Sequence, residues 1–536
     1  MSLFDFLRKW SGRLEQEEAA EPALETVAAA DVDTLATKVP HSKTQHRPNP
    51  AARAEAILAH LALAVKDPAA QAARNWKLSR VVWRAGELCL PEALPYLAQL
   101  LPQAGSENPA LMRYCLLWAL ARCARNASEA QKSNVQAALR HLLDAAVDEQ
   151  TYQVAVQIFS PSERAVYREN LVQKLPPYFQ QLIQRASNAN AMEVGEKLRL
   201  TLEDYLKNRP KSQFNFVEKL YALTSDFPFL RPAVCYFAQE APFKAGYFKV
   251  LRHLYKMAEM RLDAELYGIL SVRFAAVRPN FTAFPEGART YMELDGAWQA
   301  VNQREELAKA DSRLAFSNKT REWFIRRSMQ TLLQSFEYTD HTFVKLATSL
   351  MLGLDDERHI SQLRWESSYK YDPKTRRWDE LRTYYPPYRE YLSIFYLLYG
   401  AFGHLKLCRN NTEWSIGNDH YKDWEKAAGN FPFLPHAERW DACPQAYIHL
   451  LVEGKAALVL EFALARFQAH PQYAELLQRF DQNLLGQLLK KKHRPTALFA
   501  LNILVKQFDP SQPNRALLLE LLNNPHVEIR EQGYQW

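Results

Sequence analysis

Three stretches near the C-terminus decide the fold: YIHLLVEGKAALVLEFALARF (447–467), LGQLLKKKHRPTALFALNILVKQF (485–508) and LLELLNNPHVEIREQGYQW (518–536). Each stretch reads as an apolar helix, a short polar turn and a second amphipathic helix. Neither helix of such a pair can bury its apolar stripe alone, so neighbouring pairs must stack on one another. Equivalent leucines mark the repeat at intervals of 38 and 33 residues, at Leu451, Leu489 and Leu522.

Helical spacing of apolar residues continues ahead of these stretches. It is clear over 51–158, and 160–310 reads as long helices punctuated by proline. We therefore predict an all-α protein, an α-solenoid of HEAT- or armadillo-like helical pairs with an irregular central region. Its N-terminal helical repeats would occupy 51–310 and its C-terminal HEAT-like repeats 311–536.

Composition supports an ordered protein and excludes several classes. Hydrophobic residues make up 48% and charged residues 24% of the 536 residues, as in ordinary globular proteins. Only 16 residues are glycine, about half the usual share of roughly 7%. None of the six cysteines forms a CxxC pair, which argues against a zinc module and fits a reducing, cytoplasmic compartment. The longest nearly apolar run, 391–405, is short for a membrane span, so we predict a buried helix there and no membrane span.

One segment, 361–390, interrupts the helical pattern and predicts a loop or a small β-hairpin insertion. Its cations alternate with tryptophan and tyrosine, a combination that suits nucleic-acid phosphates and unstacked bases, although several acids dilute the charge. The segment is therefore either a folded element packed on the solenoid or a binding surface. In the second case the contact residues would be Lys374, Arg376, Arg377 and Trp378.

Two further cationic groups are candidate contacts for a macromolecule. Arg326 and Arg327 would point about 100° apart on a helix. Either one pairs with an acid of a neighbouring helix while the other meets solvent, or the pair contacts phosphate or an acidic partner. The second group falls in an interhelical turn, where the negative end of the helix dipole favours cations. It is either a solvated helix end or a contact surface, and consists of Lys490, Lys491 and Lys492.

The N-terminus has a different character. Residues 1–12 predict a short amphipathic helix, and 13–50 a flexible tether with seven acids and no Lys or Arg between Leu14 and Thr37. Subtracting these seven charges from the net +7 leaves about +14 on the rest of the chain. The helix either docks on its own body, stays unfolded, or binds a partner or membrane face. Its docking residues would be Leu3, Phe4, Phe6, Leu7 and Trp10.

No catalytic motif is present: the sequence has no phosphate-binding loop, dinucleotide fingerprint, nucleophile elbow or HExxH. Two polar clusters, 355–359 and 418–420, could supply metal ligands or a catalytic histidine, but fit helix caps and a satisfied loop histidine better. We therefore predict no catalytic, cofactor-binding or metal-binding residues. An enzyme would need a site assembled from distant residues.

Two blocks in the second half of the chain resemble bacterial HEAT-repeat proteins of the kind often associated with a WGR domain. The segment 312–336 matches a Ser/Asn-x-Thr turn followed by an aromatic residue and a double arginine, and 436–467 matches an acidic-x-Trp-Asp entry into a HEAT pair. The resemblance covers about 250–536 and implies an α-solenoid without catalytic residues; no WGR domain is visible. The matching residues are Asn318, Thr320, Trp323, Arg326, Arg327, Glu438, Trp440, Asp441 and Pro444, and the last turn adds Asn523, Pro525, Val527 and Arg530.

These observations predict a cytoplasmic, non-enzymatic scaffold that binds a protein partner over a curved helical surface. The alternative is a nucleic-acid-binding solenoid that grips phosphate with its basic body and contacts bases with 361–390. Affinity that falls steeply with salt would distinguish the second from the first.

Overall fold

The computed structural model describes most of the chain from Pro50 onward. The described ranges are 50–67, 75–102, 109–187, 189–208, 214–244, 246–279, 289–294, 297–302, 305, 317–338, 341–359, 362–372, 376–408, 412–508 and 514–536. The predicted helix of 1–12 and all of the tether before Pro50 lie outside them. The described residues form two compact units, whose boundary falls inside one helix after Leu266.

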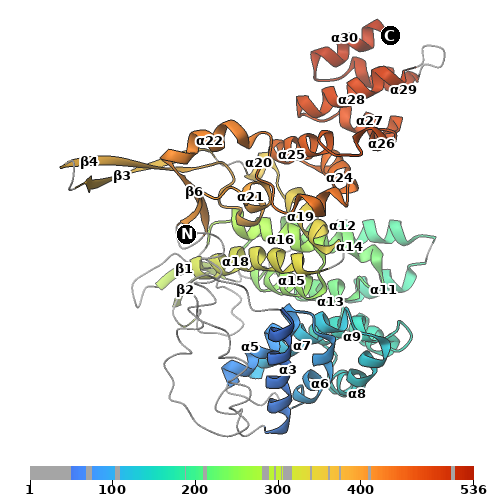
Figure 1. Cartoon of the computed structure of the whole chain (residues 1–536). Helices are drawn as coiled ribbons and strands as arrows, with labels where there is room; N and C mark the ends of the chain where they lie inside the picture. The colour runs from blue at the N-terminus through green and yellow to red at the C-terminus, as the bar shows by residue number, and fades with distance from the viewer. Residues whose placement is uncertain are drawn as a thin grey trace. The chain divides into compact units, whose positions relative to one another are not determined.

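The N-terminal unit consists of helices and one hairpin (Figure 1). Its helices are α3 (Pro50–Lys66), α5 (Asn75–Glu87), α6 (Leu94–Leu100), α7 (Pro109–Ala124), α8 (Glu129–Ala145), α9 (Glu149–Ile158), α10 (Ala165–Gln173), α11 (Pro177–Arg185), α12 (Ala191–Asn208), α13 (Phe216–Leu223), α14 (Arg231–Glu240), α15 (Phe248–Arg261) and the start of α16 (Ala264–Ala276), with short 3-10 turns at Pro91–Ala93 and Pro228–Leu230.

Local signals in the sequence explain how several of these helices begin. Ser128 caps α8 in a capping box with Gln131, which satisfies backbone N–H groups that the first turn leaves free. Helices α5 and α7 approach closely because Trp83 and Trp118 stack, with ring centroids 3.7 Å apart. A Cβ on Gly86 would lie within 2.6 Å of the Trp118 ring, so this contact requires glycine.

The prediction of long helices throughout 160–310 is wrong at its end, where a β-hairpin follows the helices. Strands β1 (Arg289–Leu294) and β2 (Ala297–Asn302) pair antiparallel, with Leu294 opposite Ala297. The two residues between the strands are Asp-Gly in the sequence, and this dipeptide favours tight hairpin turns because both positions tolerate positive φ.

The C-terminal unit contains the rest of α16, a four-stranded sheet and the predicted helical pairs. Its other helices are α18 (Asn318–Gln334), α19 (Thr342–Leu352), α20 (Asp356–His359), α21 (Leu392–Tyr399), α22 (Asn418–Ala428), α23 (Ala437–Asp441), α24 (Gln445–Glu453), α25 (Ala457–Gln468), α26 (Tyr473–Leu477), α27 (Gln482–Leu489), α28 (Arg494–Gln507), α29 (Arg515–Leu522) and α30 (Val527–Gln535), with a 3-10 turn at Ser335–Glu337.

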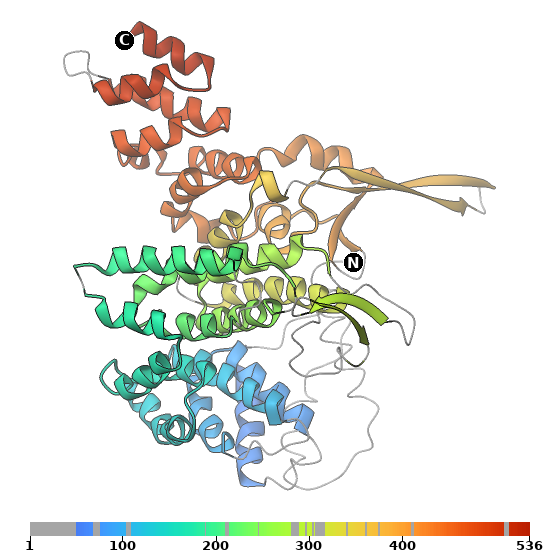
Figure 2. The same ribbon diagram turned by 180° about the vertical axis from the view of Figure 1, so that it is seen from behind.

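The C-terminal helices pack as pairs, α24 with α25, α27 with α28, and α29 with α30 (Figure 2). First helices contact the next first helix, and second helices the next second helix. The interhelical turns are also joined from pair to pair. The contacts are a parallel bridge between Asp355 and Lys455, Lys491 Nζ to Gly454 O (3.0 Å), Asn524 Nδ2 to Leu489 O (2.8 Å) and His526 Nε2 to Lys491 O (3.0 Å).

The mostly helical prediction is thus confirmed, and so is the hairpin in 361–390. Strands β3 (Arg364–Asp372) and β4 (Arg377–Tyr385) form it, and two unpredicted strands, β5 (Leu405–Cys408) and β6 (Glu413–Gly417), extend it to the order β3-β4-β6-β5. The predicted buried helix of 391–405 is shorter, because α21 ends at Tyr399 and Leu405 starts a strand. Among the described residues, no helix is both long and apolar enough to cross a bilayer.

Candidate functional site

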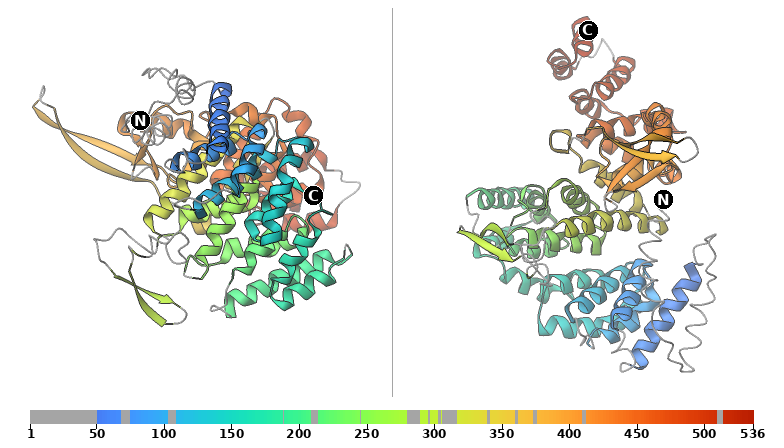
Figure 3. Two further views of the ribbon diagram at one scale, coloured as in Figure 1. Left: turned by 90° about the horizontal axis from the view of Figure 1, so that it is seen from below. Right: turned by 90° about the vertical axis from the view of Figure 1, so that its left-hand side faces the viewer.

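The β3–β4 hairpin, here called the ribbon (364–385), extends away from the helices of its own unit (Figure 3). Its base is held firmly by Tyr385, which is buried. The guanidinium of Arg364 lies 4.3 Å from the Tyr385 ring centroid and that of Arg389 lies 5.9 Å away. The Tyr385 hydroxyl donates to Glu366 Oε2 at 2.9 Å, and Arg364 lies 3.2 Å from Glu413 on β6.

A second anchor acts on the other face of the ribbon. Tyr384 stacks on Tyr421 of α22 at 4.0 Å between centroids and 12° between planes. Strand β4 pairs with β6 only at Thr383 and Tyr384, so both edges of the ribbon are free of neighbouring strands among the described residues over 365–372 and 377–382. The ribbon is therefore a rigidly mounted arm rather than an element packed on the helices.

The strand register sorts the aromatic side chains of the ribbon onto one face. Residues directly opposite in an antiparallel pair share a face, as do residues two apart on one strand. Trp365 lies opposite Tyr384 and Tyr371 lies opposite Trp378. The same face therefore carries the four exposed rings Trp365, Tyr369, Tyr371 and Trp378, whose exposed fractions are 54%, 66%, 45% and 68%.

The charges on this aromatic face neutralise one another. The guanidinium of Arg382 lies 5.2 Å from the Trp365 ring centroid and 3.1 Å from Glu380 Oε2. Hydrogen bonds from Arg382 and then from Ser367 lower the pKa of Glu380, so that the carboxylate stays charged beside the arginine. What this face offers a partner is therefore mainly apolar and aromatic surface.

The opposite face of the ribbon carries alternating charges. Lys370 lies opposite Asp379, and opposite charges at facing positions stabilise a strand pair. Of the predicted contact residues, Arg376, Arg377 and Trp378 are all exposed near the tip, and Arg376 has the left-handed φ of 56°. Lys374 lies outside the described residues.

The double arginine on α18 does not form an exposed cationic surface. Arg327 is only 4% exposed, and its Nη1 donates to Gln330 Oε1 at 3.1 Å. Arg326 is partly buried and lies 3.5 Å from Glu322, one turn earlier on the same helix. The burial of Arg327 leaves its guanidinium with almost no surface for a macromolecule, which favours the structural interpretation of this pair.

The lysines of the α27–α28 turn contact the adjacent helical pairs. Burial lowers the pKa of Lys491, whereas the ion pairs of Lys490 and Lys492 are exposed to solvent. This cationic run therefore contributes to the joints between pairs. The contacts are Lys490 Nζ to Glu520 Oε1 (2.7 Å), Lys491 Nζ to Gly454 O (3.0 Å) and Lys492 Nζ to Glu357 Oε1 (2.9 Å).

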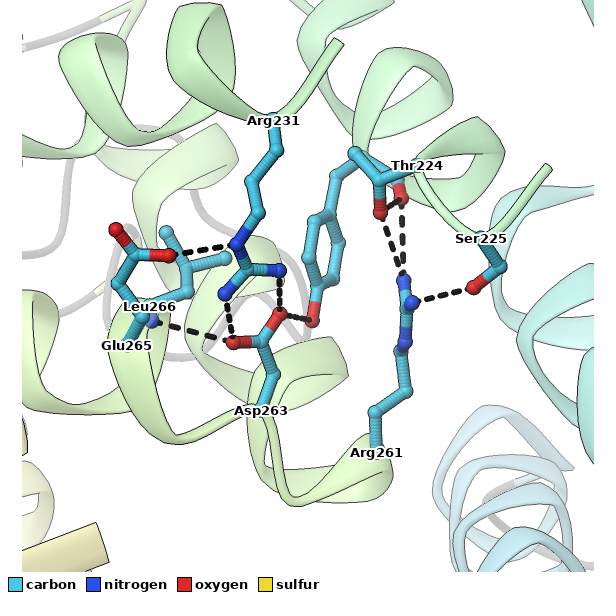
Figure 4. A network of polar contacts seen from close by, with 8 residues as sticks. Thr224, Ser225, Arg231, Arg261, Asp263, Glu265 and Leu266 are labelled. Carbon is cyan, nitrogen blue, oxygen red and sulfur yellow. Dashed lines mark hydrogen bonds and ion pairs between the residues drawn. The ribbon is translucent and has the colours of Figure 1, made fainter. Parts of the chain in front are cut away.

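A polar network centred on Asp263 in the N-terminal unit is also structural (Figure 4). Asp263 follows α15 and accepts two hydrogen bonds from Arg231, at 2.8 and 2.5 Å, and one from the Tyr221 hydroxyl at 3.1 Å. Burial alone would raise the pKa of Asp263, but Arg231 outweighs it and holds this pKa below its ordinary value. Arg261 donates to Thr224 at 3.1 Å. Every charge in this network has a partner within it, so nothing marks it as a ligand site.

The two polar clusters noted in the sequence also act as structural contacts. Asp356 Oδ2 accepts from the backbone N–H of Ala457, the first residue of α25, at 2.7 Å, and Oδ1 accepts from the Tyr388 hydroxyl at 2.5 Å. His420 stacks on His404 with ring centroids 3.5 Å apart. Within the described part of the chain, no group of three His, Cys, Asp or Glu side chains is placed to hold a metal ion.

Sequence reasoning missed one exposed aromatic site. Tyr291 on β1 and Trp298 on β2 are 68% and 73% exposed, and the register places them on one face of the β1–β2 hairpin. The Asp-Gly dipeptide between alternating segments was the signal that could have found it. The docking residues predicted near the N-terminus, Leu3, Phe4, Phe6, Leu7 and Trp10, lie outside the described residues.

Comparison with known proteins adds no relative, since no family model, curated protein or solved structure matches the chain.

Proposed function

We propose that the protein is a non-enzymatic, cytoplasmic scaffold that binds a protein partner through the aromatic face of the ribbon. The C-terminal helical pairs would provide an α-solenoid frame for this face. Such a frame agrees with the resemblance of the sequence to bacterial HEAT-repeat proteins. The observation that carries the proposal is the set of four exposed rings on one face of a firmly anchored arm.

The chemistry of this face favours a protein over a nucleic acid. Tryptophan, tyrosine and arginine dominate the binding energy of protein interfaces, and all three occur here. Nucleic-acid binding would need cations that are free to neutralise phosphates. On the ribbon, Arg382 pairs with Glu380, and Lys370 faces Asp379. The anchored base also lowers the entropy that ordering the ribbon would cost on binding.

The test removes the two tryptophans and leaves the anchoring side chains of Arg364, Tyr384 and Tyr385 in place. The double variant W365A/W378A and a control, L519A, which truncates an exposed leucine on α29, would be compared with the wild type by quantitative affinity capture. A partner retained by the wild type and L519A but lost from W365A/W378A supports the proposal. Equal capture by all three proteins contradicts it.

A titration with single-stranded DNA and RNA at two salt concentrations separates the alternative. Binding that weakens steeply with salt and requires Trp365 and Trp378 would show that the aromatic face binds a nucleic acid rather than a protein. The expected result is no salt-sensitive binding that depends on these rings.

A further inference from the structure

The outer edge of β3 has a sequence that is complementary to itself when a second copy runs antiparallel to it. Strand β3 is nine residues long, lies at the edge of the sheet and contains no proline. Such an edge presents backbone N–H and C=O groups to any strand that can align with it, and proteins commonly cover or disrupt long edges for this reason. We infer that two copies of the chain pair through β3, with a twofold axis at Ser368.

The charges of β3 determine this register. With the axis at Ser368, Glu366 lies opposite Lys370 of the second copy, and Arg364 lies opposite Asp372 of the second copy. Facing opposite charges stabilise an antiparallel pair and facing like charges destabilise it. Every charged residue of the strand therefore meets an opposite charge.

Neighbouring registers that keep the aromatic faces together do not achieve this. An axis at Ser367 would set Arg364 against Lys370 of the second copy, and an axis at Tyr369 would set Glu366 against Asp372 of the second copy. A shift of the pairing by one residue instead of two would place the aromatic face of one ribbon beside the charged face of the other. The twofold axis at Ser368 is thus preferred on both charge and side-chain orientation.

The same register joins the aromatic faces into one surface. Trp365 would lie opposite Tyr371 of the second copy, which extends the pairs Trp365–Tyr384 and Tyr371–Trp378 already present in each ribbon. The result is a row of four rings across four strands, repeated once by the twofold axis. This dimer goes beyond the proposed function and stands independently of it, since it uses the strand edge rather than the face.

Antiparallel pairing also keeps the rest of each C-terminal unit apart. The base of one ribbon lies beside the tip of the other, so the two copies of the body attach at opposite ends of the joined sheet. At the base, Arg364 already lies 3.2 Å from Glu413 and 3.4 Å from Glu366 within its own chain, so it depends least on a second copy for a partner. The pair between Glu366 and Lys370 is therefore the more discriminating contact.

Charge-swapped variants of the full chain test the register. E366K and K370E each place two like-charge pairs across the twofold axis and should not dimerise alone. An equimolar mixture should form a heterodimer, because each variant then faces the opposite charge. The double variant E366K/K370E should again form a homodimer. The measurement is sedimentation velocity up to the highest soluble concentration, where the wild type should reach twice the 62.0 kDa of one chain.

The mixture distinguishes a broken interface from a damaged ribbon. Glu366 accepts the Tyr385 hydroxyl, so E366K alone could fail through local distortion, but a distorted ribbon would not recover on mixing. A wild type that stays at single-chain mass overturns the inference. Dimers that persist in both single variants, or a mixture that stays monomeric, also overturn it.

A cysteine at the axis provides an independent check. S368C should form a reducible dimer under mild oxidation, since the two introduced thiols would face each other. The control is S133C, on the exposed surface of α8. Equal cross-linking of the two variants contradicts the inference.

Discussion

Two cationic segments of the C-terminal unit look alike in the sequence and differ in the structure. The α27–α28 turn carries Lys490, Lys491 and Lys492, and the ribbon tip carries Arg376 and Arg377. The turn side chains reach carboxylates and a carbonyl of the neighbouring helical pairs. The ribbon tip extends away from the helices of its unit, and both of its arginines are exposed. A run of cations therefore says little until the groups that surround it are known.

This contrast indicates which charges are available for function. Charges that join neighbouring helical pairs are used by the fold, because removing them would leave their partners unsatisfied. The ribbon is anchored only at its base, so its outer two-thirds can change without cost to the core. We therefore expect substitution of a charged residue to cost more folding free energy when its partners are buried and less when it is exposed.

The largest effect is expected at Asp263, the centre of the polar network in the N-terminal unit. Replacement by asparagine (D263N) leaves Arg231 beside a neutral amide and should cost about 3 kcal/mol at pH 7, because breaking a buried ion pair leaves a desolvated charge. The native pKa of Asp263 lies below the ordinary value. The stabilisation is therefore complete above about pH 4 and is lost as the pH falls through the native pKa.

Urea unfolding at pH 7 and pH 3 checks this prediction. The difference between wild type and D263N should shrink at the lower pH, since pH 3 lies below the ordinary Asp pKa of about 3.9 and protonation then favours the unfolded wild type. The control E193Q removes an exposed ion pair with Lys197 and should change stability far less than D263N does. A constant difference at both pH values would show that the charge of Asp263 is not the stabilising feature.

An intermediate effect is expected at Asp356, which joins the α20 turn to the first C-terminal helix pair. D356A removes the acceptor for the Ala457 N–H and the Tyr388 hydroxyl and should cost about 1–2 kcal/mol, as for loss of a helix cap. Its neighbour provides the control, because Glu357 is exposed and pairs with exposed Lys492. E357A should cost less than about 0.5 kcal/mol.

Hydrogen exchange locates the Asp356 effect. Peptides from α25 should lose protection in D356A and keep it in E357A, because local opening follows local stability. Unchanged exchange in α25 would mean that Asp356 does not cap this helix.

The helical pairs could be predicted because their cause is local and periodic. Apolar residues at helical spacing, a short polar turn and equivalent leucines are all visible in 447–536, and the structure forms its pairs there. The hairpin in 361–390 was visible for a similar reason, since alternation breaks the helical pattern. The aromatic face could also have been predicted, because Trp365, Tyr369 and Tyr371 are spaced by even numbers of residues and such residues lie on one face of a strand.

The remaining features depend on contacts between distant residues. Arg231 and Asp263 are 32 residues apart, and Asp356 caps a helix that begins 101 residues later. No local signal identifies such partners. For the same reason the burial of Arg327 could not be predicted, since the helical pattern marks faces but not which neighbour covers a given arginine. The β5–β6 pairing was missed because both strands are short.

The smallest losses of folding free energy are expected for single cations of the α27–α28 turn and of the ribbon tip, and the loss should be larger in the turn. K491A removes the hydrogen bond to the Gly454 carbonyl from a half-buried ammonium and should cost about 1 kcal/mol. R377A removes an exposed side chain near the ribbon tip and should stay within about 0.5 kcal/mol. Both are single truncations of a cation in the same unit, so they differ mainly in what surrounds the charge. The measurement is the urea midpoint of each variant and of the wild type. If R377A loses as much folding free energy as K491A or more, the ribbon tip is integrated into the fold. A tip that the fold needs would not be free to bind a partner.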